Sequence, residues 1–216
     1  MKASVSRGEL FKSIYLLQPT RPFFCTTKNA DGSDHVAPFA WLTPISASPP
    51  KVALALQNER GKKLAQSLVN VLREGEFGVN MPQKGQEYRL VESSFGLVKH
   101  PSKFDRTGYT RRVGQVIKAP LIEECTACLE CKVYSVIETG GDHTLLLADV
   151  VAAHYEVDCY DENLCRLAEA VPPLLNLRDY RFDDYQRHLF IDAGKTYRVD
   201  VFYEKGDEDA DRAGQE

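Results

Sequence analysis

Three cations gather just before a segment with helical spacing, in the stretch "NERGKKLAQS" at residues 58–67. Arg60, Lys62 and Lys63 lie in a turn, and Ser67 follows further along the expected helix. The first turn of a helix carries unpaired N–H groups and a partial positive charge, so it attracts a phosphate. Lysines at that end oppose the helix dipole, and a bound phosphate resolves the conflict. A solvated basic turn is the alternative, because no G-x-G-x-x-G fingerprint accompanies the cations.

A second candidate is the only tryptophan of the chain, Trp41, in "HVAPFAWLTPISASPP" at residues 35–50. Pro38, Pro44 and Pro49 interrupt this stretch, and proline lacks a backbone donor and stays out of central strands. We therefore expect a broken, loop-like connection between two strands. Its backbone N–H groups and short hydroxyls would be available to hold a ligand.

A third candidate lies in "GGDHTLLLADVVAAH", where His143 follows Asp142 at the start of a long apolar strand. An imidazole in this position can bind or orient an anionic or nicotinamide-bearing partner. The alternative is a hairpin histidine that is merely exposed. The sequence contains no persuasive Ser-His-Asp triad, H-E-x-x-H or P-loop, so hydrolase and nucleotide-phosphate chemistry have no basis in it.

Three of the six cysteines form C-x-x-C-x-x-C at Cys125, Cys128 and Cys131, a spacing found in zinc and iron–sulfur sites. The sequence continues as "LECKVYSVIE", which alternates like a strand, and on a strand Cys128 points away from the other two. A partner at this spacing is missing for the remaining cysteines, Cys25, Cys159 and Cys165. We therefore expect buried or incidental thiols and no metal, with a cysteine-based metal-binding module as the alternative.

The charge of the chain is concentrated at its C-terminal end. The net charge is −4, and the tail at residues 204–216 accounts for all of it, with six acidic residues against two basic ones. The rest is neutral and offers no broad basic face, which argues against a nucleic-acid partner. No stretch approaches the roughly 18 apolar residues that span a membrane. We expect a cytoplasmic protein that does not bind membranes and whose thiols are reduced.

The elements that position these residues are expected to be mostly strands. Alternating apolar residues and turn signals predict strands at 20–27, 35–40, 52–56, 76–82, 112–117, 129–138 and 144–157. Helical spacing predicts helices at 7–17, 61–75 and 85–93, the second ending at Gly75. Few helices and antiparallel strands predict a mainly β barrel or sandwich. We expect a single domain over residues 1–203, followed by an acidic, disordered tail at 204–216.

Five segments, in this order, resemble the flavin reductase-like family: "CTTKNADGSDHVAPFAWLTPISASPPKVALAL", "SLVNVLREGEFGVNMP", "KFDRTGYT", "IKAPLIEECTACLECKV" and "GDHTLLLADVV". They cover roughly residues 20–158. The family has the FMN-binding split-barrel fold and includes flavoredoxins and the flavin reductases of two-component monooxygenases. The resemblance implies an antiparallel Greek-key split β-barrel with a few peripheral helices.

The resemblance also assigns site residues. It implies that the flavin ring lies along the broken stretch, against Phe39, Ala40, Trp41 and Thr43, with Ser46 nearby. The FMN phosphate maps onto Arg60, Lys63 and Ser67. The nicotinamide side maps onto Asp142 and His143, with His143 as the catalytic contact.

The function that the resemblance implies is NAD(P)H-dependent flavin reduction by an FMN-binding oxidoreductase. NADH or NADPH would be a transient substrate, the protein would be a homodimer, and its partner would be a monooxygenase or another electron-acceptor protein. The first alternative is a flavoredoxin-like electron-transfer protein with tightly bound FMN. The second is the metal-binding module on the cysteine cluster.

Overall fold

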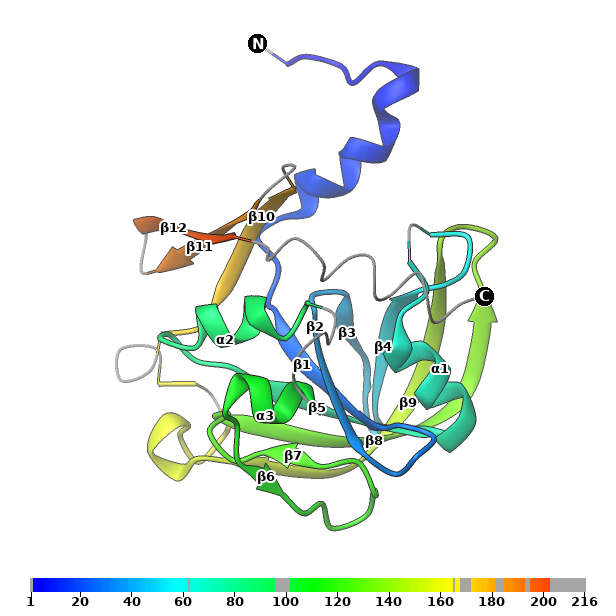
Figure 1. The fold of residues 1–216 in the computed structure, drawn as a ribbon, viewed down its shortest axis with the longest axis vertical. Coiled ribbons are helices and arrows are strands. Elements are labelled where there is room, and N and C mark those ends of the chain that lie inside the picture. Colours follow the sequence, from blue (N-terminus) through cyan, green and yellow to red (C-terminus); the bar gives the residue numbers. More distant parts are fainter. Residues whose placement is uncertain are drawn as a thin grey trace.

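The computed structural model describes residues 2–61, 63–95, 102–164, 166–167, 172–181, 185–192 and 195–202. Its body is a seven-stranded antiparallel sheet with the strand order β2-β1-β5-β8-β9-β4-β3 (Figure 1). The strands are β1 (Phe23–Lys28), β2 (Asp34–Phe39), β3 (Leu42–Ala47), β4 (Pro50–Gln57), β5 (Glu76–Met81), β8 (Ala127–Glu138) and β9 (His143–Tyr155). The mainly β, antiparallel split barrel expected from the sequence is confirmed.

Smaller elements surround this sheet. The helices are η1 (Arg7–Leu17), α1 (Gln66–Glu74), α2 (Glu87–Glu92), α3 (Lys103–Thr107) and η2 (Val157–Cys159). Two further sheets pair β6 (Arg111–Arg112) with β7 (Leu121–Ile122), and β10 (Leu175–Arg181) with β11 (Tyr185–Asp192) and β12 (Lys195–Phe202). The predicted acidic tail at 204–216 lies outside the described residues. No described helix is long and apolar enough to cross a membrane.

The core has two parts because successive residues of a strand point to opposite faces of the sheet. Phe23 and Cys25 of β1 belong to one buried cluster, which also contains Leu68 of α1. Phe24, between them, belongs to the other cluster, together with Phe104 of α3. Helix α1 therefore packs against one face of β1, and α3 with the nearby loops packs against the other.

Helix α1 is shorter than predicted but ends where the sequence indicates. It begins at Gln66, and Gly75 terminates it with a left-handed backbone, φ 71°. Glycine is the usual residue in this conformation because it has no Cβ to clash. Leu68 and Val71 are buried as predicted, whereas Leu72 is 53% exposed. The helix thus covers the barrel with a narrower apolar face than the sequence indicated.

The proline-rich stretch is an edge strand, and the prediction of a loop was wrong. β3 pairs with β4 from Leu42, opposite Leu54, to Ala47, opposite Pro50. The register shifts between Pro44 and Ser46, so a bulge absorbs the proline within the ladder. An edge strand tolerates proline because one side of it makes no ladder hydrogen bonds.

The predicted strand at 112–117 is also wrong, since β6 ends at Arg112 and a loop follows. A single carboxylate replaces the missing ladder bonds. Glu130 of β8 is fully buried and accepts the backbone N–H groups of Gln115 (2.7 Å), Val116 (2.6 Å) and Ile117 (2.8 Å). Its Oε1 also lies 2.7 Å from His154 Nε2. The loop is therefore held from inside the protein rather than by a neighbouring strand.

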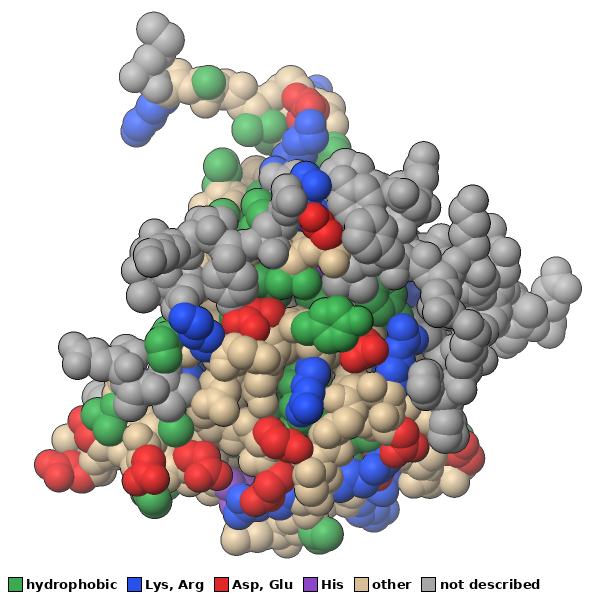
Figure 2. Space-filling model, turned by 60° about the vertical axis from the view of Figure 1, so that its left-hand side comes forward, with side chains coloured by type: hydrophobic (Ala, Val, Ile, Leu, Met, Phe, Trp, Pro, Cys, Tyr) green, Lys and Arg blue, Asp and Glu red, His purple; other side chains and the backbone are tan. Residues whose placement is uncertain are grey.

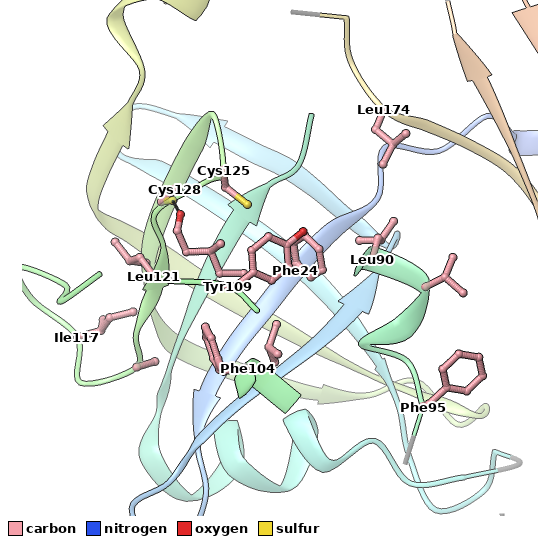
Figure 3. Packing of buried hydrophobic residues seen from close by; sticks show 14 of the residues in the cluster. Phe24, Leu90, Phe95, Phe104, Tyr109, Ile117, Leu121, Cys125, Cys128 and Leu174 are labelled. Carbon is pink, nitrogen blue, oxygen red and sulfur yellow. Dashed lines mark hydrogen bonds between the residues drawn. The ribbon is translucent and has the colours of Figure 1, made fainter. Parts of the chain in front are cut away.

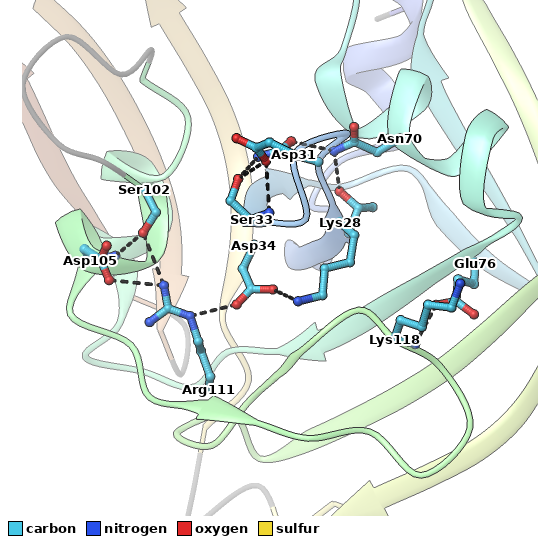
Figure 4. A network of polar contacts seen from close by, with 12 residues as sticks. Lys28, Asp31, Ser33, Asp34, Asn70, Glu76, Ser102, Asp105, Arg111 and Lys118 are labelled. Carbon is cyan, nitrogen blue, oxygen red and sulfur yellow. Dashed lines mark hydrogen bonds and ion pairs between the residues drawn. The ribbon is translucent and has the colours of Figure 1, made fainter.

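A polar network joins the β1–β2 hairpin to α3 (Figure 4). Asp34 at the start of β2 accepts hydrogen bonds from Lys28 and from Arg111 Nε, the latter at 2.9 Å. The Arg111 guanidinium also reaches Ser102 Oγ at 3.2 Å and Asp105 Oδ1 at 3.1 Å. Arg111 of β6 thus joins β2 to α3, and Asp34 extends the network to Lys28 of β1. Figure 2 shows a face on which acidic and basic side chains are interspersed, without a broad patch of one sign.

The N-terminal segment projects away from the barrel (Figure 1). The helix predicted at 7–17 is present as η1, but none of its residues is buried. Its predicted apolar stripe, Leu10, Phe11, Ile14 and Leu17, is exposed. Two contacts hold the base of the segment: Thr20 pairs with Asn176, and the Arg178 guanidinium lies 4.2 Å from the centre of the Tyr15 ring.

Candidate functional site

The predicted phosphate turn leads into α1, and this helix begins without a side-chain cap. Ala65 occupies the N-cap position and makes no side-chain hydrogen bond, and the first turn contains no acidic residue. The first amides of a helix need acceptors from outside the helix and attract negative charge. Arg60 and Lys63 are exposed in the turn before it, whereas Lys62 lies outside the described residues. The turn thus combines two exposed cations with an uncapped helix start, a combination that attracts an anion.

The turn itself is tight because Gly61 lies against the Gln57 side chain. A Cβ on residue 61 would lie 2.3 Å from Gln57 Cγ, so a larger residue would displace that side chain. The Gly61 N–H donates to the carbonyl of Asn58 at 3.0 Å. A compact turn with two described cations and an uncapped helix start fits a phosphate group such as that of FMN.

Ser67 lies in this helix but its side chain does not face the turn. It is fully buried, and its Oγ has no hydrogen-bond partner of ordinary geometry. Burial raises the pKa of the Cys25 thiol, Cys131 raises it further, and only the neighbouring Ser67 hydroxyl lowers it. The hydroxyl therefore points into the barrel core, toward Cys25. What Ser67 can offer a phosphate is its backbone N–H in the first turn of the helix.

Asn58 joins the phosphate turn to the β8–β9 hairpin, although its sequence pattern did not indicate a site residue. Its Oδ1 accepts the N–H of Arg60 at 3.0 Å. Its Nδ2 lies 3.2 Å from the Gly141 carbonyl and 3.4 Å from Thr144 Oγ1. Its own N–H donates to the carbonyl of Asp142 at 3.0 Å. The signal that could have found it is an Asn two residues before a cationic Gly turn, where Asn side chains often bond the backbone.

The structure places Trp41 and His143 side by side, as expected if both residues belong to one binding site. Strand β4 pairs with β9 so that Gln57 is opposite His143. Trp41 immediately precedes β3, on the other side of β4, and its carbonyl accepts the N–H of Ala55 at 3.0 Å. The two rings lie 4.4 Å apart, centroid to centroid, at 32°. The Trp41 side chain is 42% exposed. An aromatic surface next to an imidazole can accept a planar ligand.

The carboxylate of Asp142 orients the His143 imidazole. Asp142 Oδ1 lies 2.8 Å from His143 Nδ1. That hydrogen bond is the main reason why the pKa of Asp142 is lowered. The His143 carbonyl accepts a hydrogen bond from Thr139 Oγ1, which closes the hairpin at its base. The contact through Nδ1 leaves Nε2 as the nitrogen that can meet a ligand.

The other predicted ring contacts spread along β2 and β3. Phe39 is half-buried and packs on the barrel core, 6.3 Å from Phe23 between ring centroids. Ala40 is half-buried and Thr43 is exposed next to Trp41. Ser46 lies opposite Lys51 at the far end of β3, about 16 Å along the strand from Trp41. A ligand that contacts both ends must therefore lie along the edge strand.

The cysteine motif is divided between the two core clusters. Cys125 and Cys128 lie in the same cluster as Tyr109 (Figure 3), and Cys131 lies in the other one. The prediction that Cys125 and Cys131 share a side was wrong, because β8 begins only at Ala127 and alternation does not extend to residue 125. Among the described residues no group of three His, Cys, Asp or Glu side chains could hold a metal ion. Cys165 lies outside the described residues.

Residues 17–182 match the flavin reductase like domain, and the chain belongs to this family. An uncharacterized protein of Aquifex aeolicus is 26% identical over 156 residues, which cover 72% of this chain and 79% of that protein. The match confirms the family resemblance noted in the sequence. It supports an oxidoreductase function that involves flavin.

Solved structures with the same fold confirm the architecture. Nitrilotriacetate monooxygenase component B from Bacillus cereus matches with a TM-score of 0.72 and 19% identity, over 94% of this chain and 98% of that chain. Flavoredoxin of Desulfovibrio vulgaris matches with a TM-score of 0.64 and 18% identity, over 95% of this chain and 97% of that chain. At these identities the likeness shows the fold alone.

Proposed function

We propose that this protein binds FMN and catalyses its reduction by NADH or NADPH. The observation that supports this most is the link between an anion-binding turn and an aromatic–imidazole pair through one buried asparagine. When bound, FMN accepts a hydride from the nicotinamide and passes electrons on, and the protein supplies position and electrostatics. The family membership of the chain is consistent with this chemistry.

Each part of the site has a proposed role. Arg60 and Lys63 hold the phosphate by charge-assisted hydrogen bonds, helped by the first amides of α1, including that of Ser67. The backbone of residues 39–43 and the Trp41 ring bound the flavin ring, and Ser46 meets its far end. His143 contacts the nicotinamide nucleotide through Nε2. Asp142 keeps the imidazole in the orientation that this contact needs.

A second copy of the chain is proposed to cover the outer strands. Ile45 of β3, Tyr134 and Ile137 of β8 and Val151 of β9 are each more than a third exposed. Large apolar side chains exposed on one sheet are typical of a surface that another protein covers. We assign this surface to a homodimer, with the flavin ring near its edge.

Two kinds of electron acceptor are considered for the reduced flavin. One solved neighbour is a monooxygenase component, and a monooxygenase that receives reduced flavin is the first proposed partner. The alternative is a flavoredoxin-like carrier that keeps its FMN and exchanges electrons with a protein. The contact between Trp41 and His143 favours this alternative, because the indole occupies space beside the imidazole that a nicotinamide would need.

The experiment is an absorbance titration of the full-length protein with FMN, followed by NADH or NADPH in the absence of oxygen. Binding of FMN and bleaching of its absorbance by either nicotinamide would support the reductase. Binding of FMN that only a chemical reductant bleaches would support the carrier. Failure to bind FMN would contradict both functions.

A further inference from the structure

We propose that Asn58 is a positioning residue that fixes the His143 hairpin relative to the phosphate turn, so that a flavin held at one is correctly placed for the other. This inference rests on the proposed function, since it assigns a phosphate and a nicotinamide to the two parts. The geometry itself does not depend on any ligand. It consists of one buried amide shared by two segments 83–86 residues apart in the sequence.

The side chain of Asn58 makes hydrogen bonds both to the phosphate turn and to the hairpin. Its oxygen accepts the Arg60 N–H, which belongs to the phosphate turn. Its nitrogen donates to Gly141 and Thr144, which flank the Asp142–His143 pair. Asn58 is only 6% exposed. A buried amide bonded on both sides specifies the distance between the groups it joins, because leaving either side unpaired is costly.

The Asn58 side chain adds to two other ties near the exposed tip of the hairpin, since the Asn58 N–H donates to the Asp142 carbonyl and Thr139 Oγ1 donates to the His143 carbonyl. Residues 138–142 are exposed, and Gly140 has a φ of 79°. Thr144 extends the link, since its Oγ1 donates to Glu138 Oε1 at 3.1 Å and so ties both strands of the hairpin to Asn58. A displaced hairpin would separate the His143 ring from Trp41.

Trp41 reports this geometry directly. It is the only tryptophan of the chain, and its ring contacts His143. Removal of a ring in contact with an indole changes the surroundings of the indole and therefore its fluorescence emission. The emission of His143→Ala is therefore the reference for a Trp41 that has lost its contact with residue 143. Any variant that moves the hairpin should give an emission close to this reference, and the measurement needs no flavin.

Two variants distinguish the hydrogen bond of Asn58 to the phosphate turn from its hydrogen bonds to the hairpin. Asn58→Asp keeps an oxygen for the Arg60 N–H, but an ionised carboxylate cannot donate to Gly141 or Thr144. Asn58→Ala loses the hydrogen bonds to both the phosphate turn and the hairpin. The matched control is Asn80→Ala: Asn80 is also buried and also makes three side-chain hydrogen bonds, to Phe24, Thr26 and Ile122, far from the hairpin.

The experiment compares Trp41 emission in the flavin-free full-length proteins, then FMN and riboflavin affinity and the KM for NADH or NADPH. We expect Asn58→Asp and Asn58→Ala each to shift emission toward that of His143→Ala and to raise KM roughly tenfold. Both should reduce the preference for FMN over riboflavin, and Asn58→Asp should reduce it more because its carboxylate repels the phosphate. Asn80→Ala should lower the melting temperature but leave the Trp41 emission and the KM unchanged.

Wild-type emission in both Asn58 variants would overturn the positioning role, whatever the protein does with flavin. A shift equal to that in Asn80→Ala would overturn it too, because the effect would then be general destabilisation. If wild-type protein fails to bind FMN, the proposed function is wrong. The emission comparison would still decide whether Asn58 positions the hairpin.

Discussion

At the scale of single residues, Lys63 offers the most direct test of the phosphate turn. Riboflavin lacks the phosphate, so Lys63→Ala should weaken FMN about tenfold and leave riboflavin nearly unchanged, as expected for one charged hydrogen bond. Isothermal titration with both flavins measures this difference. Lys12→Ala, an exposed lysine of η1, is the control and should bind FMN normally. Equal affinity of the wild-type protein for the two flavins would remove the assignment.

His143 separates the reductase from the carrier. His143→Ala should raise the KM for NADH or NADPH roughly tenfold, with FMN affinity little changed, because one polar contact to the nicotinamide nucleotide is lost. Stopped-flow measurement of flavin bleaching at low nicotinamide concentration tests this. If the variant reduces flavin as fast as the wild type, His143 does not contact the substrate.

Ser67 and Asn58 show what residue types and spacing can and cannot predict about the site. A serine near a helix start is a reasonable phosphate ligand, but helix rotation decides where it points, and packing of Leu68 and Val71 into the barrel turns Ser67 inward. Asn58 looks like an ordinary turn residue in the sequence. Its importance depends on a hairpin more than 80 residues away, which local patterns do not reveal.

At the scale of elements, the loop held by Glu130 should depend on pH. Burial alone would raise the pKa of Glu130, but hydrogen bonds from His154 and from the N–H groups of Gln115, Ile117 and Val116 outweigh it and lower the pKa from 4.5 to about 2. A carboxyl whose pKa is lower in the folded state stabilises the fold above its unfolded pKa. That contribution is lost as the pH falls from 4.5 toward 2.

We therefore expect Glu130→Gln to lower the free energy of unfolding by on the order of 3 kcal/mol at neutral pH. The difference from wild type should shrink as the pH falls through this window. Chemical denaturation at several pH values measures it, and Glu123→Gln, an exposed carboxylate, serves as the control. A constant difference at all pH values would mean that shape, not charge, matters at this position.

The positions of helices and strands were predicted correctly where a single sequence signal determined them. They were predicted wrongly where the tertiary structure overrode the local signal. Strand alternation placed β8 and β9, and Gly75 marked the end of α1. The prolines of β3 indicated a loop, but an edge position and a bulge made a strand possible. Residues 112–117 are predicted as a strand, yet the buried carboxylate of Glu130 accepts the backbone N–H groups of residues 115–117 instead.

At the scale of the whole molecule, the proposed dimer can be tested by placing a charge on the outer strands. Ile137→Asp should produce a monomer in analytical ultracentrifugation, because a carboxylate would be buried in an apolar interface. The control is Val113→Asp, since Val113 is 90% exposed on the loop after β6. A wild-type protein that sediments as a monomer would contradict the dimer.

The burial of the cysteines has a consequence for a protein of this chemistry. Reduced flavin reacts with oxygen and releases peroxide, and peroxide attacks thiolates. All five described free cysteines are buried. Burial raises the pKa of Cys128 and of Cys131 to about 12, so these thiols stay protonated at neutral pH. Under the proposed function, the described thiols would thus resist oxidation by the peroxide that flavin reduction generates in air.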